Sequence, residues 1–291
     1  MLIKPPISPP LAVHQAVQSL LSGDVPFLWH PLSGGRTNST WLGTCKEQNV
    51  VVKLYTGPST NLLFPNDPQA EAQIMRLLGA SSLVPKLLGS LSTPAGRCTV
   101  YSHIPGKTWS TDATLVGVMM RNLHHLVPPA WLRKAPNGSS ALIAQTRKIL
   151  DFCSGASELI GLTPEGGVPE WDTAVMLHCD IVPGNLIVSP TGLHLIDWQC
   201  PAFGDPCEDI AIFLSPAMQK IYRGAPLSSS EISEFFEGYA NRVVAERYRS
   251  LASTYHWRMA AYCLWQSQNG REDYQNGVEL EIQAMRNALT T

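Results

Sequence analysis

The sequence predicts an α+β protein built as two unequal lobes, and three features indicate this. Up to residue 104, short apolar stretches with strand-like spacing accompany one well-capped helix. Beyond residue 105, longer segments repeat apolar residues at helical spacing. Pro105-Gly106, a natural break, separates the two patterns. We therefore expect a small N-terminal lobe with an antiparallel sheet over 1–104 and a larger, mainly helical C-terminal lobe over 105–291.

The N-terminal lobe is expected to hold a hairpin, two further strands and one main helix. Stretches 38–45 and 49–55 flank the turn Cys-Lys-Glu-Gln, which is typical of an antiparallel hairpin. Asp67 followed by Pro68 indicates a helix start, and apolar residues at helical spacing continue to Gly79. The other expected elements are a short helix over 11–21 and strands over 86–91 and 98–104.

The C-terminal lobe is expected to consist of helices around one short block of strands. That block, 173–200, contains two apolar strands separated by polar loops. Its charged and amide side chains therefore stand on loops at strand ends. The expected helices cover 111–126, 140–160, 230–249 and 251–265.

Composition argues against several classes of function. The 291 residues carry 21 Lys+Arg and 23 Asp+Glu, a net charge of −2, whereas a general nucleic-acid binder has a basic excess. No run of 18 apolar residues occurs, and prolines interrupt the first ten residues where a signal peptide needs an apolar stretch. The seven cysteines show no zinc-ligand spacing. We expect a cytoplasmic protein with reduced thiols, with neither nucleic acid nor membrane as partner.

The residues that carry chemistry lie between His178 and Asp209. Asp180 and Asn185 are five residues apart, and Asp197 follows across a Ser-Pro-Thr-Gly turn. A hairpin around that turn would bring Asn185 and Asp197 to the same end of two strands, where an amide and a carboxylate oxygen suit Mg²⁺. Asp180 would then be free to receive or orient a substrate hydroxyl. Each residue alone is typical of an ordinary turn, and only their combination indicates a site.

A family resemblance is carried by three segments: His178-Cys179-Asp180 with Asn185, Ile196-Asp197-Trp198, and Gly204-Asp205-Pro206 with Asp209. Through them, over about residues 30–265, the chain resembles the aminoglycoside phosphotransferase and choline/ethanolamine kinase superfamily, small-molecule kinases with a protein-kinase-like fold. The Ile-Asp-Trp form also resembles the metal motif of thiamine kinases. Cys179 stands where protein kinases have Arg, and no Ala-Pro-Glu triplet is present. A small-molecule acceptor is therefore favoured over a protein.

The resemblance implies an ATP- and Mg²⁺-dependent phosphotransferase acting on a hydroxyl group. Asp180 would be the catalytic residue, and Asn185 and Asp197 would hold the metal. Lys53, the one lysine of an apolar strand, would bind the ATP α- and β-phosphates. Glu71, on the helix that begins at Asp67-Pro68, would hold Lys53 in place.

Further roles follow from the same resemblance. His178 would support the catalytic loop, and Asp209 would do the same by accepting backbone N–H groups at a helix start. The main chains of Ser102 and Ile104 would contact adenine at the hinge between the lobes. The segment expected to cradle the phosphates comprises Ser33, Gly34, Gly35, Thr37 and Asn38.

The acceptor is the part of the function that the sequence leaves open. An aromatic stripe at helical spacing is typical of a core, but it would also serve as a cation–π wall for a small cationic alcohol of choline, ethanolamine, thiamine or aminoglycoside type. The aromatic residues considered for it are Trp198, Tyr255, Trp257, Tyr262 and Trp265. Metabolic phosphorylation, drug inactivation and a nucleotide-binding pseudokinase or scaffold are the alternatives, with ATP and GTP not distinguished. Retention of Lys53, Asp180, Asn185 and Asp197 together favours an enzyme.

Overall fold

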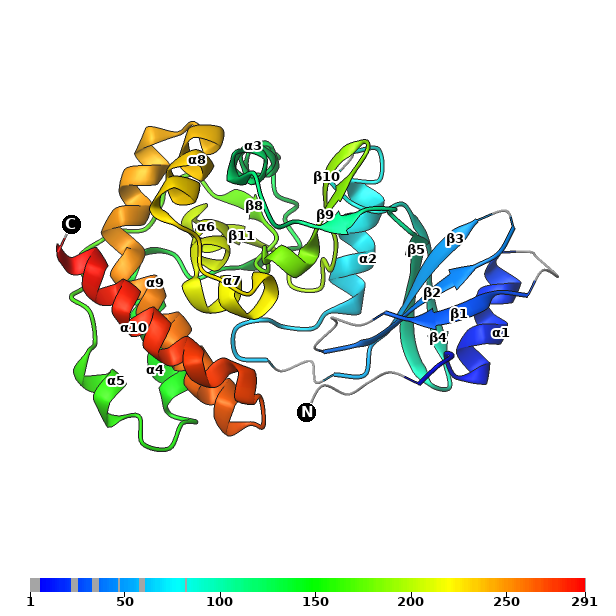
Figure 1. Cartoon of the computed structure of the whole chain (residues 1–291), viewed down its shortest axis with the longest axis horizontal. Helices are drawn as coiled ribbons and strands as arrows, with labels where there is room; N and C mark the ends of the chain where they lie inside the picture. Colours follow the sequence, from blue (N-terminus) through cyan, green and yellow to red (C-terminus); the bar gives the residue numbers. More distant parts are fainter. Residues whose placement is uncertain are drawn as a thin grey trace. The chain divides into compact units, whose positions relative to one another are not determined.

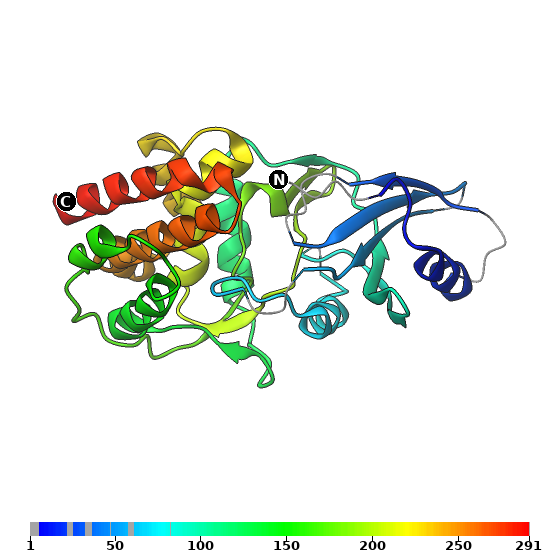
Figure 2. The same ribbon diagram turned by 90° about the horizontal axis from the view of Figure 1, so that it is seen from below.

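The computed structural model describes residues 6–21, 26–32, 37–46, 48–57, 61–81 and 83–290 (Figures 1 and 2). The chain forms two compact units. The sheet unit comprises Leu2–Lys107 and Ile187–Cys200, and the helical unit comprises Thr108–Leu186 and Pro201–Thr291. Residues 187–200 thus group with the N-terminal part, although they lie far beyond the boundary expected between residues 104 and 105.

An antiparallel five-stranded sheet, in the order β1-β2-β3-β5-β4, forms the centre of the sheet unit. Its strands are β1 (Leu28–Pro31), β2 (Ser39–Thr44), β3 (Asn49–Leu54), β4 (Leu87–Thr93) and β5 (Gly96–Ser102). The expected β2–β3 hairpin is confirmed, with Trp41 opposite Val52. Because side chains alternate along a strand, Val50 and Val52 join the core with Val13 of helix α1 (Leu11–Leu20), and Lys53 faces the other side.

Helix α2 (Pro68–Leu77) covers the side of the sheet that Lys53 faces. Its start is the one that the sequence predicts, because Asp67 Oδ1 accepts hydrogen bonds from the backbone N–H groups of Gln69 (2.9 Å) and Ala70 (3.0 Å). The helix contacts β4 and β5, and Glu71 in its first turn is buried. The cap therefore fixes where the Glu71 carboxylate meets the sheet.

A second, three-stranded sheet in the order β10-β9-β6 carries the segment with Asp197. Its strands are β6 (Lys107–Thr108), β9 (Leu186–Ser189) and β10 (Gly192–Leu195). The N–H of Leu195 donates to the carbonyl of Leu83 at 3.2 Å, which ties the end of β10 to the sheet unit. Asp197 follows directly after that tie.

The helical unit consists of helices around the small sheet β7-β11-β8. Its first elements are α3 (Ala113–His124), β7 (Arg133–Lys134), α4 (Gly138–Leu150), α5 (Ser157–Gly161), β8 (Val175–Leu177), the 3-10 helix η1 (Pro183–Asn185) and β11 (Ala202–Gly204). It continues with α6 (Cys207–Leu214), α7 (Pro216–Arg223), α8 (Ser229–Tyr239), α9 (Arg242–Gln268), η2 (Glu272–Tyr274) and α10 (Gln275–Thr290).

Two kinds of packing hold the helical unit together. Helix α9 is buried almost all round from Leu251 to Cys263, because α4, α6 and α10 pack against it; α9 and α10 run side by side in Figure 1. Helices α3 and α8 instead meet at glycines. A Cβ on Gly238 would lie 2.2 Å from the carbonyl oxygen of Thr114, so only glycine permits this crossing.

The structure corrects three expectations about the elements of the helical part and of the strand block. The helix expected over 140–160 is interrupted between α4 and α5, where Gly155 takes a left-handed backbone (φ +64°). The helices expected over 230–249 and 251–265 divide earlier, because Ala240 is left-handed and Asn241 accepts a hydrogen bond from Val244 N–H to cap α9. The block 173–200 contains three strands, β8, β9 and β10, in place of two.

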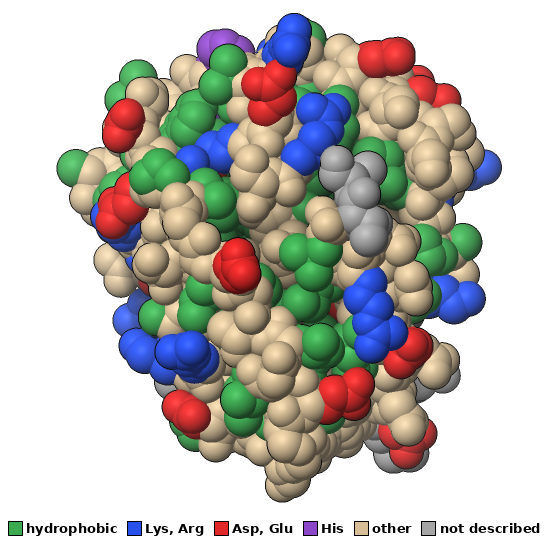
Figure 3. All heavy atoms as spheres, turned by 90° about the vertical axis from the view of Figure 1, so that its left-hand side faces the viewer, with side chains coloured by type: hydrophobic (Ala, Val, Ile, Leu, Met, Phe, Trp, Pro, Cys, Tyr) green, Lys and Arg blue, Asp and Glu red, His purple; other side chains and the backbone are tan. Residues whose placement is uncertain are grey.

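Cysteine burial, surface charge and helix hydropathy relate to the expectations drawn from composition. Cys45 in the sheet unit and Cys153 in the helical unit are half-buried, and the other five cysteines are buried. The face shown in Figure 3 intersperses Lys and Arg with Asp and Glu, so neither sign dominates it. Among the described residues, no helix has the length and apolar character that crossing a membrane requires.

Candidate active site

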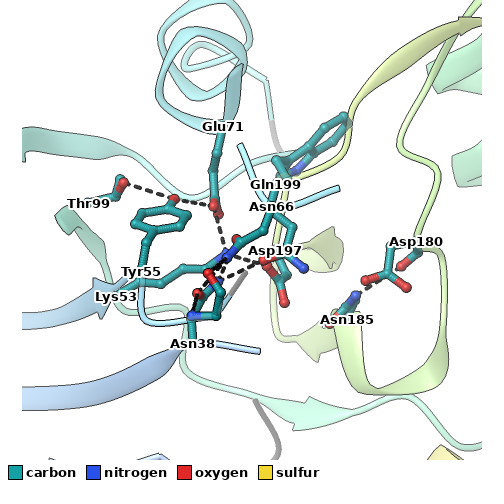
Figure 4. Close-up of polar contacts among 12 residues, drawn as sticks. Asn38, Lys53, Tyr55, Asn66, Glu71, Thr99, Asp180, Asn185, Asp197 and Gln199 are labelled. Atoms are coloured by element: carbon teal, nitrogen blue, oxygen red, sulfur yellow. Dashed lines mark hydrogen bonds and ion pairs between the residues drawn. The ribbon is translucent and has the colours of Figure 1, made fainter. Parts of the chain in front are cut away.

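A buried ion pair lies at the centre of the sheet unit (Figure 4). Lys53 on β3 is 3% exposed, and its Nζ lies 2.7 Å from Oε2 of Glu71 on α2. The same Nζ also pairs with Oδ1 of Asp197, which follows β10. Burial alone would lower the pKa of Lys53, but the carboxylates of Asp197 and Glu71 outweigh it and hold that pKa well above its usual value. Lys53 therefore keeps its positive charge.

Tyr55, which was not predicted, completes the surroundings of this pair. Its hydroxyl bonds to Oε2 of Glu71 and lies 3.1 Å from Oγ1 of Thr99, and its ring centroid is 5.1 Å from the Lys53 Nζ. Lys53 and Tyr55 are two residues apart and so face the same side of the strand, which is the signal that could have found it. Glu71 is thus fixed by two hydrogen-bond donors.

Asp197 has an unusual backbone. Its φ is +65°, in the left-handed region that non-glycine residues rarely adopt, and its side chain is 28% exposed while it pairs with Lys53. Cys179, in the loop that holds Asp180, has φ +60°. Such conformations persist only where surrounding contacts hold them in place, and they cluster at functional sites.

Three side-chain amides form a cluster in the same unit, called here the amide cluster: Asn38, Asn66 and Gln199 (Figure 4). Asn38 and Asn66 exchange two hydrogen bonds, both 2.9 Å, and Asn38 Nδ2 also donates to Gln199 Oε1 at 2.9 Å. Asn66 and Gln199 are each 4% exposed. The backbone N–H of Asp67 donates to the carbonyl of Gln199 at 2.9 Å. Asn66 and Gln199 were not predicted as site residues, since lone amides carry no spacing signal.

The segment expected to cradle phosphates is only partly described. Ser33, Gly34 and Gly35 lie outside the described residues. Thr37 approaches the backbone so closely that a Cβ on Gly57 would lie 2.4 Å from its carbonyl oxygen. Asn38 directs its side chain into the amide cluster.

In the helical unit, Asp209 of α6 holds the loop that contains Asp180. Asp209 accepts hydrogen bonds from the N–H groups of His178 (3.0 Å) and Cys179 (2.7 Å), and its Oδ2 lies 3.2 Å from His124 Nε2. The N–H of Asp180 donates to Nδ1 of His178, which is fully buried. These contacts fix the backbone on both sides of Cys179.

The placement of Asp209 differs from the expectation in one respect. The N–H groups that it accepts belong to the loop, not to the start of its own helix. There, Asp205 Oδ1 accepts from the N–H of Cys207 at 3.0 Å instead. Asp209 thus bonds to the loop, while Asp205 bonds to the first turn of α6.

Asn185 lies in the same loop, at the end of η1. Its Nδ2 donates to the carbonyl of Asp180 at 2.9 Å (Figure 4), which leaves Oδ1 as the end of the amide suited to a cation. The side-chain oxygens of Asn185 in the helical unit and of Asp197 in the sheet unit are each of the hard kind that Mg²⁺ prefers. Among the described residues, no group of three or more His, Cys, Asp and Glu side chains is placed to hold a metal ion.

Of the two expected hinge residues, Ser102 has its N–H engaged in a backbone hydrogen bond. The N–H of Ser102 donates to the carbonyl of Lys86 at 2.9 Å, and its hydroxyl accepts from the N–H of Lys86. Ile104 follows β5 and is half-buried.

The aromatic residues considered for the acceptor belong largely to the core. Trp198 and Trp257 are fully buried, and their indole N–H groups donate to the carbonyls of Leu195 (3.2 Å) and Leu159 (2.7 Å). Tyr255 and Tyr262 are also buried, and Trp265 is half-buried against the ring of Tyr262. Of the two interpretations of this stripe, their burial favours the core.

A model of one protein family, described as the phosphotransferase enzyme family, matches residues 29–252. No curated protein matches the chain in sequence. Among solved structures, the chain resembles a choline/ethanolamine kinase family protein from Mesorhizobium loti with a TM-score of 0.64 at 15% identity, covering 97% of this chain and 96% of that one.

Two further solved structures show the same architecture. Choline kinase from Cryptosporidium parvum gives a TM-score of 0.65 at 14% identity, over 91% of this chain and 90% of that one. A spectinomycin phosphotransferase, solved with ADP and spectinomycin, gives a TM-score of 0.59 at 16% identity, over 93% of this chain and 98% of that one. At these identities the likeness is one of fold.

Proposed function

The chain belongs to the phosphotransferase enzyme family, and on that premise we propose that it transfers the γ-phosphoryl group of ATP to a hydroxyl of a small cationic molecule. The predicted family and the kinase-like α+β fold are confirmed. The observation that carries the proposal is the buried Lys53–Glu71 ion pair with Asp197 on the same ammonium group. A lysine kept charged next to a metal-binding carboxylate is what binding of a triphosphate requires.

In the proposed reaction, ATP and R–OH give ADP, R–O–PO₃²⁻ and a proton. Lys53 neutralises phosphate charge, and Glu71 orients it. Asn185 and Asp197 would hold Mg²⁺, which supplies charge neutralisation on the transferring phosphoryl group when bound. Asp180 orients the acceptor hydroxyl and receives its proton. Positioning accounts for most of the rate, because phosphoryl transfer needs little covalent chemistry from the protein.

The acceptor class and the location belong to the same proposal. The three solved structures are named as a choline/ethanolamine kinase family protein, a choline kinase and a spectinomycin phosphotransferase. Choline, ethanolamine and spectinomycin are all alcohols that carry a cationic nitrogen. We propose an acceptor of that class, which includes thiamine and aminoglycosides, in a cytoplasmic protein that uses neither nucleic acid nor membrane as partner.

The test measures Mg²⁺-dependent ADP release from ATP with choline, ethanolamine, thiamine and several aminoglycosides. One acceptor should raise turnover well above the hydrolysis background. With that acceptor, Asp180→Ala should lower kcat by on the order of 10²–10⁴-fold while ATP still binds. Asp197→Ala should abolish Mg²⁺-dependent turnover.

Asp151→Ala is the matched control, because Asp151 is exposed at the end of α4. It should behave as the wild type. Wild-type turnover in Asp180→Ala would refute the assigned roles. Nucleotide binding without phosphoryl transfer to any acceptor would favour the pseudokinase alternative.

A further inference from the structure

We infer that the amide cluster of Asn38, Asn66 and Gln199 is a positioning device for Asp197, and that Asn38 acts through it and not by touching the nucleotide. The inference rests on the proposed function, since it concerns how the metal-binding carboxylate is held. It also revises the sequence-based role of Asn38, which was a direct contact to the cofactor.

The cluster joins segments that are remote in sequence but belong to one compact unit. Asn38 precedes β2, Asn66 precedes α2, and Gln199 lies two residues after Asp197. Asn38 Nδ2 donates to the side-chain oxygens of both partners, so both of its protons are engaged. Its Oδ1 accepts from Asn66 Nδ2. Asn38 is therefore the centre of the cluster.

The cluster also gathers backbone groups. Asn38 Oδ1 lies 3.3 Å from the N–H of Thr56, and Asn66 Nδ2 lies 3.3 Å from the carbonyl of Gly57. Both residues follow β3, the strand that carries Lys53. The carbonyl of Gln199 accepts from the N–H of Asp67, the residue that caps α2 and thereby places Glu71. One set of bonds thus links the segments on which Lys53, Glu71 and Asp197 stand.

Asp197 needs such support because of its backbone. A left-handed φ of +65° persists only where neighbouring contacts over-determine it. On the N-terminal side, Leu195 is tied to Leu83 by a backbone hydrogen bond. On the C-terminal side, Gln199 is held through both its side chain and its carbonyl. Loosening Gln199 should therefore let the Asp197 carboxylate leave the position from which it serves the metal.

Neutral amides suit this role for a chemical reason. An amide donates and accepts at once, so three of them can form a closed set of bonds in a poorly hydrated place. Each partner left without its bond would be a buried polar group with no compensation. The cluster should consequently respond to the loss of a single donor or acceptor more strongly than exposed amides do.

The experiment measures binding of a non-hydrolysable ATP analogue by calorimetry, as a function of Mg²⁺ and in EDTA. Gln199→Leu keeps the bulk of the side chain but removes the acceptor. We expect the Mg²⁺ concentration at half-saturation to rise about tenfold, the lower end of the effect of losing a direct outer-shell partner, because Gln199 supports Asp197 through the backbone. Binding in EDTA should stay unchanged. Gln69→Leu, at an exposed glutamine of α2, is the matched control and should leave both quantities unchanged.

Two variants that each introduce a carboxylate test the hydrogen bond between Asn38 and Gln199. Gln199→Glu should retain Mg²⁺-dependent binding, because a carboxylate still accepts from Asn38 Nδ2. Asn38→Asp should be tolerated in part, because Asn66 Nδ2 still donates to the side-chain oxygen at position 38 and the Gln199 amide can rotate to donate. The double variant places two carboxylates against each other, so its loss of binding should exceed the product of the two single effects.

The outcomes separate the two proposals. If the wild type binds the analogue with Mg²⁺ and Gln199→Leu binds it equally well, the positioning role is wrong while the proposed function stands. Equal weakening of binding with Mg²⁺ and in EDTA would also refute it, because that is the result of a merely structural role. If the wild type binds no nucleotide at all, the proposed function fails and the inference fails with it.

Discussion

Tyr55 shows how a single hydroxyl can support a charged site. It fills one acceptor position of Glu71 that Lys53 leaves open, and Thr99 in turn holds Tyr55. A carboxylate with both donors in place has one orientation, so its partner ammonium group has one orientation as well. The position of Lys53 therefore depends on a residue that never needs to touch the nucleotide.

Tyr55→Phe should reveal this dependence. The variant leaves the ring in place but removes a hydrogen bond to a buried carboxylate, which is worth about 2 kcal/mol of the free energy of unfolding. We expect the KM for ATP to rise more than kcat falls, because Lys53 would be less well placed before chemistry begins. Urea unfolding and steady-state kinetics measure the two effects.

Tyr101→Phe is the control for that change. Tyr101 is buried on the neighbouring strand, and among the described residues its hydroxyl bonds to neither Lys53 nor Glu71. The control should lose little stability and no affinity for ATP. Equal losses in both variants would show that the hydroxyl of Tyr55 has no special role.

At the scale of single elements, helix α8 illustrates a start that is built from several bonds. Ser228 and Glu231 form a reciprocal capping box, and Arg223 pairs with the Glu231 carboxylate. The hydrogen bond from Arg223 lowers the pKa of Glu231 to about 2. The helix start is thus tied to the end of α7.

The pH dependence of stability should show this cap. Because the pKa of Glu231 is lower in the folded than in the unfolded state, its contribution is present above the unfolded value of about 4.3 and is lost as pH falls towards 2. Glu231→Gln should therefore be less stable than the wild type at pH 7, with the difference shrinking between about pH 5 and pH 2. Urea unfolding across that range measures it, and a constant difference would contradict the assignment.

The α3–α8 crossing reverses the usual effect of replacing a helical glycine. Alanine in a helix interior normally stabilises by about 1 kcal/mol, but at Gly238 the added methyl group would meet the Thr114 carbonyl. Gly238→Ala should instead destabilise by about 1–3 kcal/mol, the effect of overpacking. Thermal unfolding measures the sign. Gly161→Ala, where nothing lies within 4 Å of an added Cβ, is the control and should not destabilise.

How far the sequence predicted these elements depended on local signals. The β2–β3 hairpin and the start of α2 follow from alternation and from Asp67-Pro68, so both were predicted. The interruption between α4 and α5 has no proline, and Gly155 looks like a tolerated helix residue until its left-handed backbone is seen. The end of α8 at Tyr239 has only a weak signal: Asn241 is typical of a helix cap, but alanine rarely takes the left-handed backbone that Ala240 has.

The candidate site divides in the same way. Lys53 and Glu71 were paired because each has an unusual place within its own element, and the structure brings them together. The amide cluster was not predicted, because Asn38 and Gln199 are 161 residues apart and neither is unusual locally. Bonds of that kind depend on how remote segments are folded together, which spacing does not record.

At the scale of the whole molecule, the proposed nucleotide should stabilise the folded chain. A ligand that binds only the folded state at about 100 times its Kd adds about 2.7 kcal/mol. We expect Tm to rise with MgADP and to rise less with ADP in EDTA. Asp197→Ala should remove the part that depends on Mg²⁺, whereas Asp151→Ala should keep it. A Tm insensitive to MgADP would contradict nucleotide binding.

The distribution of thiols has a practical consequence. Five cysteines are shielded by burial, and the two half-buried ones, Cys45 and Cys153, stand one in each unit. The unmodified chain thus offers a donor dye and an acceptor dye one attachment point apiece, with no cysteine to delete. Energy transfer between such dyes would report in solution, molecule by molecule, whether the distance between the two halves changes when nucleotide or alcohol is added.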